Sequence, residues 1–273
     1  MVETSQTEGG VTPTFQPVSK VTCISFSDTK ERKRNMRWCM HKNRGFRRIT
    51  EAIAPGTDKE IAIVAGGPSL NKTYKEVSNY EYVMTCGSSH DHAIRLGIKP
   101  TYHIECDPSL HQIKMYNEPS NAKYLISSRC HKSMFKKLSG RDIYLWHMWE
   151  ADLGKPIYNS EPAFICGATV VLSAIPVALV MQFKKMHFFG FDSSFESKEE
   201  HHAYPQPETA QMLTVKVGDP VDGREFQTTA TWLGQAQQFE EMRNHWQFDA
   251  TIHGDGLTAE MERTRKLNME KAA

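Results

Sequence analysis

The feature that most constrains the fold is an alternation, after residue 57, of short apolar runs with stretches that can form helices. The apolar runs lie at residues 61–65, 82–86, 102–106, 124–127, 143–146 and 187–189. Runs this short, and rich in β-branched and aromatic residues, are typical of strands buried on both faces. Candidate helices lie between them, notably at residues 88–96 and 168–183. The pattern predicts an α/β fold with a Rossmann-like, mainly parallel sheet and helices on both of its faces.

The pattern changes near the C-terminal end. Residues 212–229 show strand alternation around two turn signals, Gly218-Asp219 and Asp222-Gly223, which predicts a small β-hairpin flap. A polar-faced helix is expected at residues 232–246, followed by a final strand and turn at residues 248–257. We therefore expect a disordered tail at residues 1–20, a basic extension at residues 21–57 and a Rossmann-like domain at residues 58–273.

Charge is balanced overall, with 33 Lys and Arg against 32 Asp and Glu, so no overall field draws the protein to nucleic acid or membranes. One basic block begins at Lys30, ends at Arg48, and holds nine Lys and Arg against one Glu. It is interpreted either as a helix with a solvated basic face or as a docking surface for nucleic acid or another anionic polymer.

The six cysteines are scattered, without a Cys-x-x-Cys pair, which favours reduced thiols and a cytoplasmic location. The N-terminus lacks the basic and apolar regions of a secretion signal. No stretch reaches the roughly 18 apolar residues that a membrane span needs, so no membrane span is expected.

Ligands of doubly wound sheets bind beyond the carboxyl ends of the strands, so the loops there are the candidate site. The first strand is followed by Gly66, Gly67, Pro68, Ser69 and Leu70. Glycines let a backbone approach a phosphate closely, and a following helix would direct N–H groups at it. The loop matches neither the dinucleotide fingerprint nor the P-loop, so a purely structural turn is the alternative.

Further strand ends carry small or acidic residues. Gly87 and Ser88 follow the second strand, and Asp107 follows the third. A carboxylate at this position can bind ribose hydroxyls or a divalent metal, although an Asp before Pro also commonly caps a turn.

Two more segments complete the candidate site. Gly167, Ala168 and Thr169 open the long apolar helix and offer its N-terminus to an anion, with ordinary capping by the threonine as the alternative.

Asp192 follows the sixth strand, and a polar loop after it holds His201, His202 and Tyr204. A histidine there can act as a general base, with Asp192 as another candidate, and Tyr204 can donate to a phosphate. The two histidines lack zinc-site spacing and can equally be incidental, and no serine lies in a nucleophile elbow.

Three segments, "IAIVAGGPSL", "VMTCGSSHDHAIRLGIKPTYHIECDPSL" and "CGATVVLSAIPVALVMQFKKMHFFGFDSSF", resemble in this order the Maf/MptE-like family. That family groups motility-associated glycosyltransferases with archaeal 6-hydroxymethylpterin diphosphokinases. The similarity covers residues 60–257, apart from a weaker region at residues 117–162, and extends more distantly to small bacterial sialyltransferases that use CMP-sialic acid.

The resemblance implies a nucleotide-binding transferase domain in which residues 67–70 hold the phosphate of the donor. Asp107 matches an acidic or amide position of the family, and Asp192 matches its Gly-x-Asp strand end. The sialyltransferases have Asn, Asn and His where this chain has Gly67, Gly87 and residues 228–230, so their base is missing here. His201, His202 or His253 would have to replace it.

Three functions remain open from the sequence. The first is a glycosyltransferase that moves a sugar from a nucleotide-sugar donor to a hydroxyl, on a glycan or on a polymer such as modified DNA. The second is a diphosphokinase that transfers pyrophosphate from ATP to a pterin-like hydroxymethyl group, with Mg²⁺ on Asp107 and a further contribution from Asp192. The third is a non-catalytic nucleic-acid-binding module that uses the basic block.

Overall fold

The computed structural model describes residues 2–5, 16–17, 20–21, 27–42, 45–52, 59–150, 161–197, 200–206, 210–219 and 222–272. Cys23, most of the expected tail at residues 1–20 and residues 43–44 of the basic block lie outside this description.

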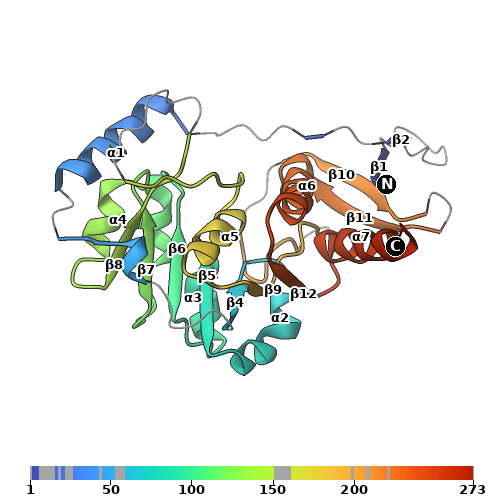
Figure 1. Ribbon diagram of the computed structural model, residues 1–273, viewed down its shortest axis with the longest axis horizontal. Helices are drawn as coiled ribbons and strands as arrows, with labels where there is room; N and C mark the ends of the chain where they lie inside the picture. Colours follow the sequence, from blue (N-terminus) through green and yellow to red (C-terminus); the bar gives the residue numbers. More distant parts are fainter. Residues whose placement is uncertain are drawn as a thin grey trace.

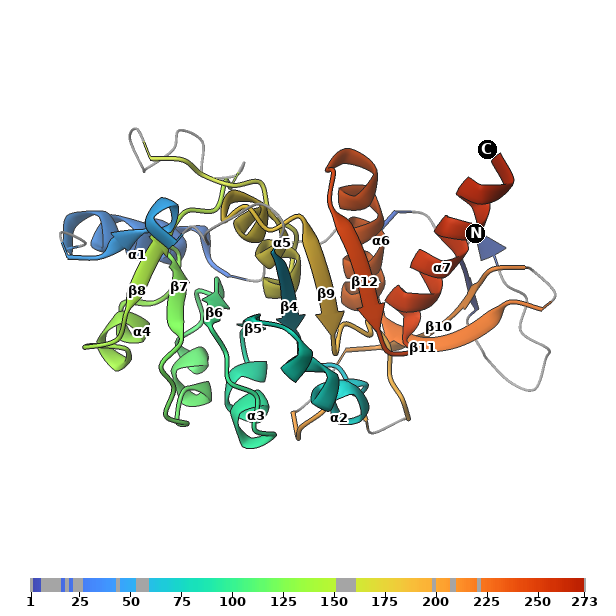
Figure 2. The ribbon, with the colours of Figure 1, turned by 60° about the horizontal axis from the view of Figure 1, so that its bottom comes forward.

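An eight-stranded sheet forms the centre of the molecule, and all of its pairings are parallel. The strand order is β12-β9-β4-β5-β6-β7-β8-β3 (Figure 2). The strands are β3 (Arg47–Arg48), β4 (Glu60–Val64), β5 (Tyr82–Cys86), β6 (Tyr102–Glu105), β7 (Lys123–Ser127), β8 (Ile143–Trp146), β9 (Lys185–Phe189) and β12 (Asp249–His253). The predicted Rossmann-like fold class is confirmed.

Helices cover both faces of this sheet (Figure 1). One face carries α5 and α6, whose apolar side chains join the largest core cluster, and the other carries α2, α3 and α4. The α-helices are α1 (Thr29–Lys42), α2 (Leu70–Thr73), α3 (Ser89–Arg95), α4 (Lys132–Lys137), α5 (Val170–Val180), α6 (Ala230–His245) and α7 (Leu257–Ala272). The 3-10 helices are η1 (Ile49–Ala52), η2 (Tyr74–Asn79) and η3 (Leu110–Met115).

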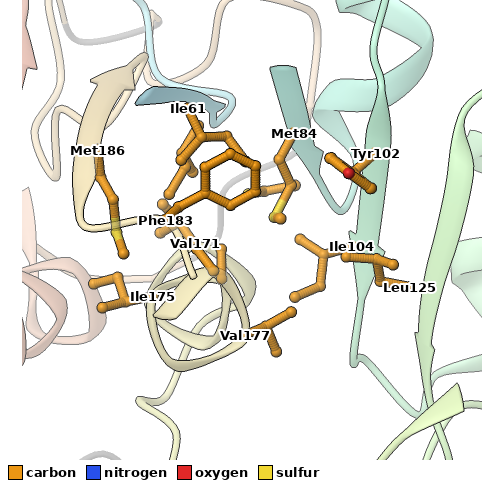
Figure 3. Close-up of a cluster of buried hydrophobic side chains, with 14 of the residues drawn as sticks. Ile61, Met84, Tyr102, Ile104, Leu125, Val171, Ile175, Val177, Phe183 and Met186 are labelled. Carbon is orange, nitrogen blue, oxygen red and sulfur yellow. The ribbon is translucent and has the colours of Figure 1, made fainter. Parts of the chain in front are cut away.

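The core is built around α5, which is apolar on every side and therefore buried along most of its length. Figure 3 shows Val171, Ile175 and Val177 of this helix among side chains of the central strands, including Ile61 and Ile104. Burying one such side chain contributes roughly 1.5–3 kcal/mol. This packing fixes the N-terminus of α5 relative to the strand ends.

A second, antiparallel sheet has the order β11-β10-β1-β2. Its strands are β1 (Val2–Ser5), β2 (Gln16–Pro17), β10 (Met212–Val217) and β11 (Arg224–Thr229). The predicted hairpin corresponds to β10 and β11, and the described part of the expected tail pairs with it. Helix α7, which the sequence analysis did not predict, packs on this sheet through Leu257 and Met261.

The order of the main sheet reverses at β4. Strands β5 to β8 follow on one side of it, whereas β9 and β12 lie on the other. The carboxyl ends of β4 and β9 therefore form the topological switch point, which is where open α/β sheets bind their ligands.

Candidate functional site

A cavity of about 210 Å³ lies at this switch point. Its walls come from the loops that follow β4, β5 and β9, from the N-terminus of α5, and from the start of α6. Of the predicted site residues, eight line it: Gly66, Gly67, Gly87, Ser88, Thr169, Asp192, His201 and His202. The structure thus brings together residues that lie up to 136 positions apart, from Gly66 to His202.

The loop after β4 is a fixed turn, because the protein itself uses several of its N–H groups. Gly67 N–H donates to Gly190 O at 2.7 Å, and Leu70 N–H donates to Gly67 O at 3.1 Å. Ser69 N–H donates to the Asp192 carboxylate at 2.9 Å. These three amides are therefore engaged in holding the loop, and Leu70 itself is fully buried in the core.

The two glycines of the loop are required by close neighbours. A Cβ atom on Gly67 would lie 2.4 Å from Asp192 Oδ2 and 2.7 Å from Gly190 O. A Cβ atom on Gly66 would lie 2.5 Å from the Tyr204 hydroxyl. Because real Cβ atoms do not approach other atoms this closely, a side chain at Gly67 would displace the loop, and one at Gly66 would displace the side chain of Tyr204.

Asp192 joins the loop after β9 to the loop after β4. Its side chain is only 6% exposed, and burial raises the pKa of its carboxyl group, while hydrogen bonding from Ser69 opposes that rise. Gly254 and Gly256 leave room for it, since a Cβ on either would lie 3.3 Å or less from Asp192 atoms. This geometry makes Asp192 a positioning residue of the site, and a role for it as a base stays a prediction.

The loop with the two histidines folds over the first loop. Ala203 N–H donates to Gly66 O at 2.9 Å, and the Tyr204 hydroxyl lies 2.6 Å from Ser88 Oγ. The His201 ring stacks on Trp232 with centroids 5.8 Å apart, and the His202 ring lies edge-on to the same indole at 5.9 Å. Both imidazoles therefore have fixed orientations at the cavity wall.

Two buried polar atoms in this wall have no hydrogen-bond partner among the described residues: Gln112 Oε1 and Thr169 Oγ1. Thr169 is the N-cap of α5, yet its hydroxyl makes no capping bond. Across the cavity, a Cβ on Gly87 would touch Val170 at 3.5 Å, and the backbone of Gly87 is left-handed with φ of 53°. Buried polar atoms are normally paired, so two unpaired oxygens in one wall are unusual.

The remaining predicted residues lie elsewhere. Asp107, Gly167 and Ala168 line a larger neighbouring cleft, and Ala168 N–H donates to Gln238 at 2.8 Å. Pro68, Ser69, Leu70 and Tyr204 are not part of the described lining, although Ser69 bonds to Asp192 and Tyr204 to Ser88, which are.

Several residues at the cavity were not predicted from the sequence. Gln235 donates to Ser193 Oγ at 2.8 Å, and Thr258 donates to the same oxygen at 2.7 Å. Ser193 has a left-handed backbone with φ of 54°, which is uncommon for a residue other than glycine. The other missed wall residues with polar or aromatic side chains are Gln112, Ser194 and Trp232.

The predicted metal role of Asp107 stays a prediction. Both of its oxygens are used within its own loop, one by Ser109 N–H at 2.7 Å and the other by Gln112 Nε2 at 2.9 Å. Among the described residues, no group of three or more His, Cys, Asp or Glu side chains is arranged to hold a metal ion. The bond from Ser109 N–H also agrees with the expected capping of a turn by Asp107.

A buried polar network lies directly behind the cavity. Glu105 accepts hydrogen bonds from the N–H groups of Cys106 and Asp107 at 2.7 and 2.8 Å, and from the Tyr116 hydroxyl at 2.8 Å. The Tyr116 hydroxyl also lies 2.8 Å from His103. Burial raises the pKa of Glu105 to about 7.

We expect Glu105→Gln to flatten the pH dependence of the free energy of unfolding between pH 4.5 and 7. Because the folded-state pKa of Glu105 is raised, its contribution to stability is complete below pH 4.5 and is lost as the pH rises through 7. The loss is about 3 kcal/mol for this group. Glutamine can still accept from Cys106 and Asp107 but cannot ionise. Urea unfolding at several pH values checks this, and parallel curves for both proteins would contradict it.

The basic block forms helix α1 over much of its length. Arg32, Asn35, Met36 and Cys39 are buried on one side, whereas Lys30, Arg34, Arg37 and His41 are exposed on the other. This agrees with a helix that has a solvated basic face, and binding of nucleic acid or another polyanion there stays a prediction. The other described cysteines are Cys86, Cys106 and Cys130, which are buried, and Cys166, which is partly buried.

No helix among the described residues is both long enough and apolar enough to cross a membrane.

Together, the parallel sheet and the cavity at its switch point place the chain among Rossmann-like α/β proteins. The model of a family described as 6-hydroxymethylpterin diphosphokinase MptE-like matches residues 35–198. Because the matched residues make up more than half of the chain, the chain belongs to the MptE-like family.

Solved structures of similar fold include the Maf glycosyltransferase from Magnetospirillum magneticum AMB-1, with a TM-score of 0.57 and 13% sequence identity. The similarity covers 89% of this chain but only 41% of the Maf glycosyltransferase, so this chain spans less than half of the length of that protein. A mammalian sialyltransferase has a TM-score of 0.41 and 9% identity, over 86% of this chain and 90% of that one. No curated protein sequence matches the chain.

Proposed function

We propose that this protein is a nucleotide-dependent glycosyltransferase, which moves a sugar from a nucleotide-sugar donor to a hydroxyl group. The observation that carries the proposal is the cavity at the switch point, whose wall includes Gln112 and Thr169, two residues with a buried side-chain oxygen that lacks a hydrogen-bond partner among the described residues. A sugar hydroxyl could donate to either oxygen, and the Thr169 hydroxyl could also donate to a phosphate. Membership of a family whose description names a diphosphokinase, and the fold shared with a Maf glycosyltransferase, agree with a transferase.

The N-terminus of α5 is the better phosphate site within this cavity. The loop after β4 uses the N–H groups of Gly67, Ser69 and Leu70 internally, which limits what it can offer to an anion. In contrast, Thr169 and Val170 open an 11-residue helix and both line the cavity. The first amides of a helix carry partial positive charge and bind anions. Gly66 and Gly87 would then form the opposite wall.

His201 and His202 are the proposed bases. Both line the cavity, and both are held by ring contacts with Trp232. In the transfer, the acceptor oxygen forms a bond to the anomeric carbon of the donor, and the bond from that carbon to the phosphate oxygen breaks. The nucleotide leaves with the bonding electron pair, stabilised by the α5 amides, and the acceptor proton passes to a histidine.

The diphosphokinase is the second candidate, because the family description names that activity. It would use ATP with Mg²⁺, for which the sequence offered Asp107. That carboxylate is committed to Ser109 and Gln112, and it lines the larger cleft rather than the small cavity. We therefore assign no step to a metal.

Product analysis separates the two candidates. The protein is incubated with Mg²⁺ and either ATP plus 6-hydroxymethylpterin or a set of UDP-, GDP- and CMP-sugars, and the nucleotides are resolved by chromatography. We expect release of UDP, GDP or CMP from one of the sugar nucleotides. Formation of AMP from ATP in a pterin-dependent manner would instead assign the diphosphokinase activity.

A further inference from the structure

A second, larger cleft of about 1290 Å³ adjoins the small cavity. The two share Thr169 and Val170, so the N-terminus of α5 forms the boundary between them. Helix α6 forms one wall, and the segment after β8, with Met148 and Trp149, forms another. A ligand in this cleft would therefore lie next to the proposed phosphate site, on the other side of Thr169 and Val170.

The charged side chains of this cleft balance each other. Its described lining holds three cations, Lys20, Arg32 and Arg129, and three carboxylates, Asp107, Glu150 and Glu241. Lys20 pairs with Glu241 at 2.6 Å, and Glu150 pairs with Arg32 and, at 3.5 Å, with Arg129.

Asp107 is bonded within its own loop, and the exposed cations of α1 lie outside the cleft lining. Because the described lining of the cleft carries no surplus positive charge, the cleft favours an uncharged ligand over a polyanion.

Exposed apolar surface lies within the same cleft. Trp149 is 44% exposed and Ile165 is 70% exposed, whereas most large apolar side chains of the described chain are buried. Trp246 also lines the cleft, together with the polar side chains of Gln238 and His245. An indole with hydrogen-bonding groups beside it can bind a ligand ring that has apolar faces and polar groups around its edge. A sugar ring has this character.

We propose that the larger cleft binds the acceptor as an uncharged carbohydrate, with a sugar ring against Trp149 and one hydroxyl directed past Thr169 into the small cavity. This inference rests on the glycosyltransferase function proposed above, since it names the acceptor class of that reaction. The bond changes are those of that transfer: the acceptor oxygen gains the sugar, and its proton passes to His201 or His202.

The test measures carbohydrate binding without any donor, so that it stays separate from the test of transfer. The probes are methyl β-galactoside, methyl α-glucoside, methyl α-mannoside and chitobiose. Their binding to the full chain is measured by saturation-transfer NMR. We expect at least one to bind, and Trp149→Ala to raise its dissociation constant about tenfold or more, with partial recovery in Trp149→Phe. Leu267→Ala, which removes another exposed apolar side chain, 56% exposed on α7, should leave the affinity unchanged.

Three results would overturn the proposal. One is that none of the four carbohydrates binds. Another is that the affinity in Trp149→Ala equals that of the unmodified protein. The third is that heparin or double-stranded DNA displaces the bound carbohydrate, with a strong dependence on salt, which would assign the cleft to a polyanion. Absence of transfer with carbohydrate binding intact would count against the glycosyltransferase and leave the cleft assignment standing.

Discussion

Gly67→Ala is expected to lower the free energy of unfolding by about 3 kcal/mol and to weaken nucleotide binding, because Gly67 lines the cavity. The new Cβ atom would lie 2.4 Å from Asp192 Oδ2 and 2.7 Å from Gly190 O. Gly190 has little room to retreat, because its own φ is 63° and a Cβ placed on it would meet Ala65 O at 2.7 Å. The loop after β4 must therefore move, which breaks the bond from Ser69 N–H to Asp192.

Thermal unfolding measures this effect, with an expected fall in Tm of roughly 10 °C. Gly45→Ala is the matched control, since a Cβ at Gly45 has no atom within 4 Å, and its effect should stay within about 0.5 kcal/mol. Equal melting temperatures for Gly67→Ala and Gly45→Ala would contradict this prediction. They would show that the close approach of Asp192 does not require a glycine at position 67.

Replacing both cavity histidines, as His201→Gln with His202→Gln, is expected to lower kcat for sugar transfer by roughly 10²–10⁴-fold. Glutamine keeps hydrogen-bonding groups near Trp232 but cannot take up a proton at neutral pH. The single variants then show which imidazole acts as the base, because only one of them should carry most of the loss. The rate is measured at saturating donor, so that weaker binding does not imitate slower chemistry.

His41→Gln serves as the control, since His41 is exposed on α1 and belongs to neither cavity lining. If the double variant keeps its rate within threefold of the unmodified protein, neither histidine is the base. Asp192 would then be the next candidate, despite its bond to Ser69.

Most strands of the main sheet could be predicted because each is a short apolar run that no other element explains, whereas β3 consists of two arginines of the basic block and was not expected. The observed bounds differ by one or two residues, as at Lys185–Phe189, where an exposed lysine begins a strand expected at residue 187. Helix α7 was missed because many of its residues are charged, which obscures the few apolar positions that contact the second sheet.

The candidate site was partly predictable for a similar reason. Residues at strand ends, such as Gly87 and Asp192, follow from sheet topology alone. Gln235 and Ser193 do not, because their hydrogen bond joins residues 42 positions apart in different elements.

The function of the loop after β4 could not be predicted from its sequence either. Its composition suggests phosphate binding, but the structure shows that Asp192 and Gly190 already accept hydrogen bonds from two of its N–H groups.

The most direct test of the proposed function is the identity of the nucleotide that the protein releases. With UDP-, GDP- and CMP-sugars as donors, and the carbohydrate that binds the larger cleft as acceptor, we expect one nucleotide to accumulate together with a glycosylated product. The same reaction should fail in Gly67→Ala. Formation of AMP from ATP and 6-hydroxymethylpterin, with every sugar nucleotide left intact, would contradict the assignment as a glycosyltransferase.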